Sequence, residues 1–225
     1  MGGTATIAIE IVTDVGPAQP SNYLLDNFVA HKLSSLTTCG APELAMESAW
    51  LNSFILHNLH SVRPSVKERA YLFNFIRRTE GAFSAYRAAR LALIEYVSTP
   101  PTVISPYFRS LLNFEVCVSQ CWQACELVMT MTGDKKGAFK PNDNSDAERL
   151  YGLYIDAKHM DDMIDKGNLL DAATTGLWIT NQGLESTRTP SGVAFSELIE
   201  ILTSMGQEAE TLARLDPFNP DAPAA

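Results

Sequence analysis

The sequence has no long apolar run, which bears on whether it could enter a membrane. Charged residues interrupt every apolar stretch of the 225-residue chain well before the roughly 20 consecutive residues that span a bilayer. The first 20 residues also lack the basic start and continuous apolar centre of a secretory signal. We therefore expect no membrane partner and a cytoplasmic location. The apolar content of 46% is enough for a folded core.

Motifs of several common enzyme classes are missing as well. The chain contains no Gly-x-Ser-x-Gly, no P-loop, no Cys-x-x-Cys and no His-Asp dipeptide. These absences argue against nucleophile-elbow hydrolases, P-loop nucleotidases, paired-cysteine metal sites and the His-Asp metal phosphohydrolases.

Cysteine is scarce, and three of the four residues form one row. Cys117, Cys121 and Cys125 recur every fourth residue in "FEVCVSQCWQACELVM". On a helix the outer two lie about 12 Å apart, so the three cannot all bind one metal ion. A cytosolic chain keeps its thiols reduced. We expect small core residues here.

Basic residues are scarce in the C-terminal part. Residues 1–140 are close to neutral, whereas residues 141–225 carry essentially all of the net charge of −9. An acidic surface repels phosphate backbones, so we do not expect a nucleic-acid partner.

Helical periodicity with clear end signals dominates after residue 40. Pro42 opens a predicted helix at 42–62, and a capping box of Ser65 and Glu68 opens one at 66–97. Ser105 and Pro106 open a helix at 105–133, and a second capping box, Ser145 with Glu148, opens one at 145–167. The prediction is an all-α fold, an antiparallel four-helix bundle with extra flanking helices.

The flanks contain shorter predicted elements. Residues 1–40 read as an N-terminal arm and a short helix, and 41–167 as the helical bundle. In 168–215, "GLWITNQGLES" and "GVAFS" suggest a small β-hairpin-like appendage, followed by a C-terminal helix capped by Ser196. Residues 216–225 read as a tail.

The stretch closest to a chemical motif is "ERLYGLYIDAKHMDDMIDKG", residues 148–167. On a helical wheel Asp156 and His159 lie opposite the apolar stripe. "DDMID" resembles the Asp-Asp-x-x-Asp magnesium box of terpene and prenyl-diphosphate synthases, which would make Asp161, Asp162 and Asp165 metal ligands. The second metal motif that those enzymes need on a facing helix is missing. We interpret the stretch as a solvated acidic face and expect no cofactor; metal-dependent phosphate or diphosphate chemistry is the enzyme alternative.

The predicted helix at 66–97 carries charges inside its apolar arc, among them Glu80, Arg87 and Arg90. Buried charges need partners or a ligand. One hypothesis is internal ion pairs with glutamates of neighbouring helices, and the other is a pocket for an anionic small molecule. We favour the ion pairs.

The predicted helix at 42–62 has two faces to bury. Trp50, His57 and His60 share one stripe, and Leu44, Leu51, Ile55 and Leu59 form another. The two histidines have no third metal ligand nearby, which favours a helix-end or interface role. We expect a homodimer or a protein partner.

Three stretches, "AWLNSFILHNLHS", "AERLYGLYIDAKH" and "LWITNQGL", resemble a group of bacterial helical proteins, and the bundle resembles the HEPN superfamily of four-helix domains. The resemblance implies dimers and a role in bacterial defence, toxin–antitoxin or nucleotide-linked pathways. Catalytic HEPN proteins are metal-independent ribonucleases with an Arg-x(4–6)-His motif. Here Arg149 precedes His159 by ten residues. We therefore expect a non-catalytic interaction or ligand-binding module; an atypical HEPN ribonuclease is a further enzyme alternative.

Overall fold

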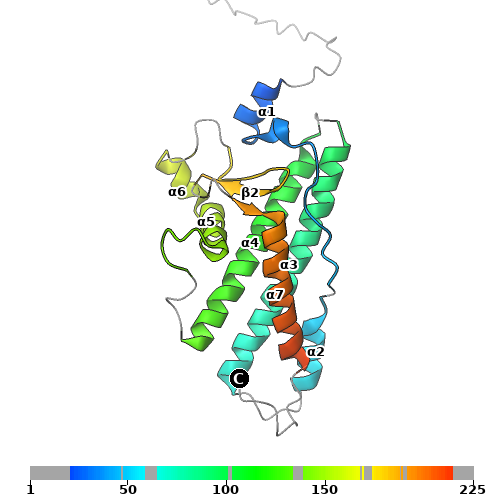
Figure 1. Ribbon diagram of the computed structural model, residues 1–225, viewed down its shortest axis with the longest axis vertical. Coiled ribbons are helices and arrows are strands. Elements are labelled where there is room, and N and C mark those ends of the chain that lie inside the picture. The colour runs from blue at the N-terminus through cyan, green and yellow to red at the C-terminus, as the bar shows by residue number, and fades with distance from the viewer. Residues whose placement is uncertain are drawn as a thin grey trace, which may run out of the picture.

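The structure is a computed structural model that describes residues 21–46, 48–58, 65–100, 103–133, 139–167, 169, 174–187, 189 and 192–214. These residues are mostly helical and include one small sheet (Figure 1). The elements in chain order are α1 (Asn22–Phe28), η1 (Leu33–Ser35), α2 (Trp50–Asn58), α3 (Val66–Ser98), α4 (Ser105–Thr132), α5 (Asp146–Lys158), α6 (Met160–Asp165), β1 (Leu177–Ile179), β2 (Gly183–Ser186), β3 (Val193–Ala194) and α7 (Phe195–Arg214). Among the described residues, no helix is both long enough and apolar enough to cross a bilayer.

The centre of the fold is a long antiparallel hairpin made by α3 and α4 (Figure 1). The predicted capping box opens α3, because the Ser65 hydroxyl accepts from the Glu68 amide and the Glu68 carboxylate accepts from the Ser65 amide. The two helices are joined in their buried interior, where the Ser110 hydroxyl donates to the Ala89 carbonyl at 2.9 Å. Local end signals and an apolar interface therefore account for both helices.

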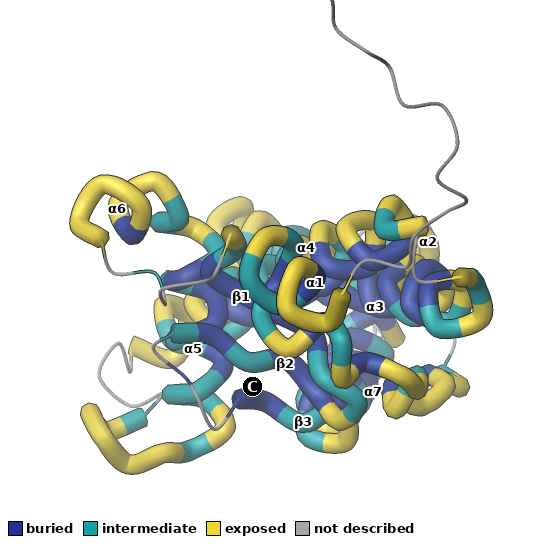
Figure 2. Tube along the Cα trace, turned by 90° about the horizontal axis from the view of Figure 1, so that it is seen from above, coloured by how far each residue is buried: buried dark blue, intermediate teal, exposed yellow. Residues whose placement is uncertain are grey.

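Helix α7 packs on one side of this hairpin, against α3 and α2, and α5 packs against α4 (Figure 2). Phe195, at the start of α7, stacks on Phe114 of α4 with ring centroids 5.2 Å apart. The sequence treated the last helix as a flank beginning after Ser196. In the structure it begins at Phe195 and supplies core residues, among them Leu198, Leu202 and Ala209.

The small sheet lies at one end of the hairpin, beside α5 and the start of α7 (Figure 1). Strand β2 pairs antiparallel with β1 and with β3, in the order β1-β2-β3. The predicted extended pair is therefore a three-stranded sheet. Strand β3 continues directly into α7, so the sheet sets where the last helix begins.

Two predicted helices differ from the structure. The helix predicted at 42–62 begins only at Trp50, and the described residues before it, 41–46 with Ser48 and Ala49, run without regular structure beside α3. We call these residues the strap. The helix predicted at 145–167 is interrupted at His159, whose φ of −115° and ψ of 39° are not helical. The predicted arm at residues 1–20 and the tail at 216–225 lie outside the described residues.

Asn181, in the turn between β1 and β2, holds the segment that leads to the strap. Its side-chain oxygen accepts from the amides of Thr37 and Thr38, both at 3.0 Å, and its side-chain nitrogen donates to the Ser35 carbonyl at 2.9 Å. Asn181→Ala should lower the free energy of unfolding by about 1–2 kcal/mol, because it leaves these backbone groups without their partner. Urea unfolding measures the change.

The matched control for this prediction is Asn27→Ala. Among the described residues, the Asn27 amide group donates to the Tyr23 carbonyl, one turn back in the same short helix, at an exposed site. Its removal should change stability by less than about 0.5 kcal/mol. Equal unfolding midpoints for the two variants would contradict the role given to Asn181.

Candidate functional site

The most distinctive surface is an exposed side of the α3–α4 hairpin, which no other described element covers. We call it the open face. Its members are exposed or half-buried and come from both helices: Ser84, Ala88, Leu91 and Glu95 on α3, and Arg109, Leu112, Val116 and Gln120 on α4.

Two contacts show that these residues share one side of the hairpin. At one end, Arg109 Nη2 lies 2.6 Å from Glu95 Oε2. At the other, a Cβ atom placed on Gly81 would come within 3.3 Å of the Gln120 side chain. Gly81, Ala88 and Glu95 are seven residues apart, which is close to two helical turns, so they follow one line along α3. The α4 members follow the facing line.

The middle of the open face is apolar. Leu91 is 65% exposed, Leu112 60% and Val116 41%. On α4, Phe108, Leu112 and Val116 lie four residues apart and form an exposed stripe beside the buried one that contains Leu111, Phe114 and Val118. Exposed apolar side chains that lie together on one side of a molecule are typical of surfaces that bind other proteins.

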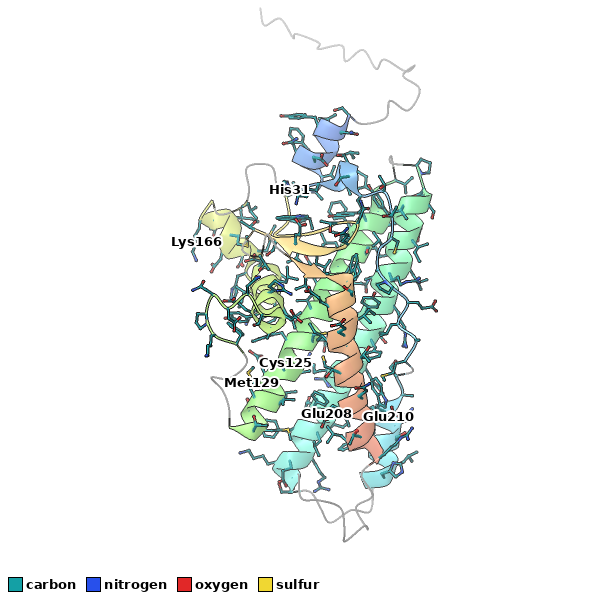
Figure 3. All side chains as sticks on the ribbon, in the orientation of Figure 1. His31, Cys125, Met129, Lys166, Glu208 and Glu210 are labelled. Carbon is teal, nitrogen blue, oxygen red and sulfur yellow. The ribbon has the colours of Figure 1, made fainter. Side chains whose placement is uncertain are left out.

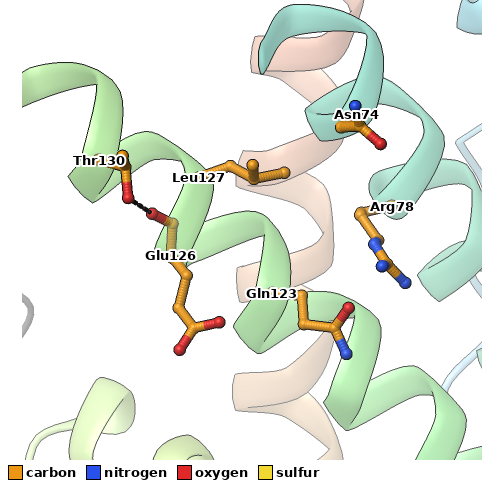
Figure 4. Close-up of a pocket in the computed structure, with 6 residues that line it drawn as sticks. All are labelled: Asn74, Arg78, Gln123, Glu126, Leu127 and Thr130. Carbon is orange, nitrogen blue, oxygen red and sulfur yellow. Dashed lines mark hydrogen bonds between the residues drawn. The ribbon is translucent and has the colours of Figure 1, made fainter. Parts of the chain in front are cut away.

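Two shallow hollows continue the open face along α4. The first, of about 350 Å³, lies between α4 and α5 and is lined by residues that include Leu112, Glu115, Val116, Tyr154 and Lys158. The second, of about 230 Å³, lies between α4 and α3 near the C-terminal end of α4. Figure 4 shows it, with Asn74 and Arg78 on α3 across from Gln123 and Leu127 on α4. α4 therefore presents a surface tens of ångströms long that is open to a partner.

Charges of both signs line these hollows. Arg78 Nη1 donates to Gln120 Oε1 at 3.1 Å, and partial burial lowers the pKa of Arg78, helped by the neighbouring charge of Arg77. In the first hollow, between α4 and α5, burial raises the pKa of Glu115. Glu126 also lines the second hollow. A surface with this balance does not select anions.

The arginines that the sequence singled out hold the strap. Arg87 Nη1 donates to the Ser48 hydroxyl at 2.8 Å and Nη2 donates to the Met46 carbonyl, while Arg90 Nε donates to the Ala41 carbonyl at 3.0 Å. The guanidinium of Arg87 also lies 5.7 Å from the ring centroid of Phe83. In the described part of the chain, these arginines make no ion pair with a carboxylate. The ion-pair hypothesis stays a prediction, because Glu47, one of the glutamates it considered, lies outside the described residues. The two arginines bond backbone and hydroxyl oxygens, and neither lines one of the hollows.

Glu80 has a capping role. Its Oε1 accepts from the amide of Leu51 at 2.8 Å, in the first turn of α2, where backbone amides have no partner within the helix. A negative charge at this end of a helix is also favourable. Glu80 thus fixes where α2 begins and is not directed at a ligand.

The predicted histidine pair is not assembled within the described residues. His57 is exposed, and its Nδ1 lies 2.7 Å from the Ser53 carbonyl one turn back. His60 lies outside the described residues. Trp50, which the sequence placed on the same stripe, is buried in the core.

Asp156 and His159 are separated by the break between α5 and α6. Asp156 is fully buried. The helical wheel drawn for one continuous helix had placed it on the solvent-facing side. His159 is half-buried at the junction and ends α5. Beyond the break, Met163 is buried and Ile164 is 56% exposed, which reverses the predicted stripe. Beyond His159 the wheel was wrong because the helix is not continuous. Asp156 precedes the break, and there the wheel did not show that α5 also packs against the small sheet.

The aspartates of "DDMID" lie on the surface of α6. Asp161, Asp162 and Asp165 are exposed, and Asp162 pairs with Lys166 at 3.1 Å in the same segment. Within the described ranges, no three histidine, cysteine or acidic side chains come close enough together to hold a metal ion. The aspartates therefore do not face a second ligand set among these residues.

The cysteine row is part of the core, as the sequence indicated. Cys117 and Cys121 are buried and Cys125 is half-buried, and all three are free thiols. A hydrogen bond from the Cys121 thiol to the neighbouring Cys117, together with burial, raises the pKa of Cys121. Burial raises the pKa of Cys125, which lies further along α4 (Figure 3), to about 12. Such thiols are poor nucleophiles near neutral pH.

Comparisons with known proteins give no relative. No protein-family model, no curated protein and no solved structure matches this chain.

The open face was not among the candidate sites from sequence. Its signal was present, since Phe108, Leu112 and Val116 recur every four residues in α4. The same helix contains a second apolar stripe, and only the packing of α3, α5 and α7 decides which of the two is covered.

Proposed function

We propose that the protein is a non-catalytic, homodimeric interaction module whose open face binds a second copy of the chain. The observation that carries the proposal is the exposed apolar group of Leu91, Leu112 and Val116 at the centre of that face. Its burial removes apolar surface from water, which is the main driving force of association. Glu95 and Arg109 at its edge give the charged rim that protein interfaces commonly have.

The HEPN-like resemblance agrees with this proposal, because that superfamily forms dimers of helical bundles. The sequence predicted an antiparallel four-helix bundle within residues 41–167, with 145–167 as its fourth helix. In this proposal the bundle instead consists of α2, α3, α4 and α7, and α5 is a flanking helix. A non-catalytic role is supported by the use of Arg87, Arg90 and Glu80 as contacts within the fold. A place in bacterial defence or toxin–antitoxin systems rests on the resemblance alone.

Light scattering at micromolar concentration should give the mass of a dimer of the 24.7 kDa chain. Leu112→Glu should raise the dimer dissociation constant at least about tenfold, which corresponds to 1.4 kcal/mol, because it places a carboxylate in the apolar centre.

The matched control is Leu56→Glu on α2, where the native side chain is 68% exposed and the helix contributes no residue to the open face. This variant should keep the parent mass. A parent protein that scatters as a monomer at these concentrations would overturn the proposed function.

A further inference from the structure

The open face has matching groups at equal heights on its two helices. Glu95 and Arg109 are level with each other, because their side chains form a 2.6 Å ion pair across the hairpin. The helices run in opposite directions, so moving one turn from this pair reaches Leu91 on α3 and Leu112 on α4. A second turn reaches Ala88 and Val116. Each level thus holds one residue from each helix: a charged pair, two leucines, and a small residue beside a valine.

We propose that the two copies meet around a two-fold axis that runs parallel to α3 and α4 and lies in front of the open face, between the two copies, so that α3 of each copy lies on α4 of the other. This inference rests on the proposed function, because it specifies the geometry of the same dimer. A rotation about such an axis keeps every residue at its height and exchanges the two helices. Leu91 of one copy then faces Leu112 of the other, and Glu95 faces Arg109.

In this arrangement the residues at each level of the open face find suitable partners on the second copy. Two Leu91 and two Leu112 side chains form one closed apolar layer, as in the core of a four-helix bundle. Each Arg109 lies between two Glu95 carboxylates, so the existing ion pair becomes a four-membered network of alternating charge. Ala88 and Ser84 are small and exposed, which leaves room for Val116 of the other copy.

The main rival is an antiparallel contact of α4 with the α4 of the second copy, with the two-fold axis perpendicular to the helices at Leu112. It would use the stripe of Phe108, Leu112 and Val116 but would leave Leu91 at the edge. The two arrangements differ in whether Leu112 faces the equivalent Leu112 of the second copy. In the rival, Leu112 meets Leu112, whereas in the proposed dimer the two Leu112 residues lie diagonally across the apolar layer.

Cysteine cross-linking distinguishes these arrangements. Leu91→Cys and Leu112→Cys are made in separate full-length chains, mixed, allowed to exchange subunits and oxidised with copper phenanthroline. The mixture should form a covalent dimer at least about tenfold faster than either variant alone, because only the mixed dimer holds the two new thiols face to face at high effective concentration. The parent chain, oxidised in parallel, reports any cross-link through its own cysteines.

The outcomes separate this inference from the proposed function. Fast cross-linking of Leu112→Cys by itself would support the rival and overturn the inference while leaving the dimer intact. A monomeric parent would overturn both.

Charge reversal keeps the inference testable if a cysteine variant does not fold. Glu95→Arg should weaken the dimer several-fold by placing four arginines at one level, and Glu95→Arg combined with Arg109→Glu should restore it. A double variant no tighter than Glu95→Arg alone, measured by light scattering over a dilution series, would count against the pairing of Glu95 with Arg109.

Discussion

Trp50→Ala should lower the free energy of unfolding by about 3–5 kcal/mol, the range for removing a large aromatic side chain from a core. Trp50 is only 7% exposed, and its ring stands edge-on to Phe83 with centroids 5.0 Å apart. A Cβ atom placed on Gly206 of α7 would lie 3.1 Å from the indole, so no spare room separates α7 from this ring. The cavity left by alanine would open where α2, α3 and α7 meet.

Leu56→Ala is the matched control for this prediction, since Leu56 lies on the same helix and is 68% exposed. It should change stability by less than about 0.5 kcal/mol. Chemical denaturation followed by circular dichroism at several protein concentrations measures both variants. If Trp50 instead belonged to a subunit interface, as the stripe with His57 and His60 suggested, its replacement would change the mass more than the stability of the folded chain.

Helix ends were predictable because their signals are local. Ser65 and Glu68 cap α3 as the sequence indicated, and Gly133, with φ of 75°, ends α4. The second capping box formed only in part. The Ser145 hydroxyl accepts from the Glu148 amide, but the Glu148 carboxylate accepts from Asn142 and Asn144 in the preceding loop. The amides of Asn142 and Asn144 thus replace the Ser145 amide as the donors to the Glu148 carboxylate.

The start of α2 was not predictable from local pattern. Pro42 and the apolar spacing that follows are typical of a first helical turn. In the structure the Pro42 carbonyl accepts from the hydroxyl of Tyr86 at 2.8 Å, and carbonyls on either side of it accept from Arg87 and Arg90. These bonds to α3 replace the helical ones, and Glu80 supplies the cap eight residues later. Contacts distant in sequence overrode the local preference.

The partners of the charged residues on α3 were not predictable for the same reason. The charges within the arc of α3 were correctly identified as needing partners, yet both hypotheses considered only carboxylates and anions. Carbonyl oxygens of the strap are also acceptors, and a one-dimensional pattern does not show that an irregular segment will lie beside a helix. Asp156 was misplaced for a related reason: it lies before the break at His159, within α5, and the wheel did not show that the small sheet would pack against this helix.

Arg87→Ala should lower the free energy of unfolding by about 2–3 kcal/mol, because the charged side chain donates to two oxygens of the strap and both would lose their partner. The donors are Nη1, at 2.8 Å from the Ser48 hydroxyl, and Nη2, which bonds the Met46 carbonyl. Arg87→Lys should recover only part of the loss, since an ammonium lacks the planar fork that reaches both oxygens. Thermal and urea unfolding of the two variants test this.

Arg77→Ala is the control on the same helix, because Arg77 is exposed and donates only to Asn74 one turn away, at 3.2 Å. It should leave stability within about 0.5 kcal/mol of the parent. A double-mutant cycle with Ser48→Ala isolates the hydroxyl bond: the losses from Arg87→Ala and Ser48→Ala should add to more than the loss from the double variant. The anion-pocket hypothesis predicts the reverse, because removing one of two neighbouring positive charges from an empty pocket relieves repulsion. An Arg87→Ala protein that melts at or above the parent temperature, and that no longer gains stability from added phosphate, would therefore show that Arg87 serves a ligand and not the strap.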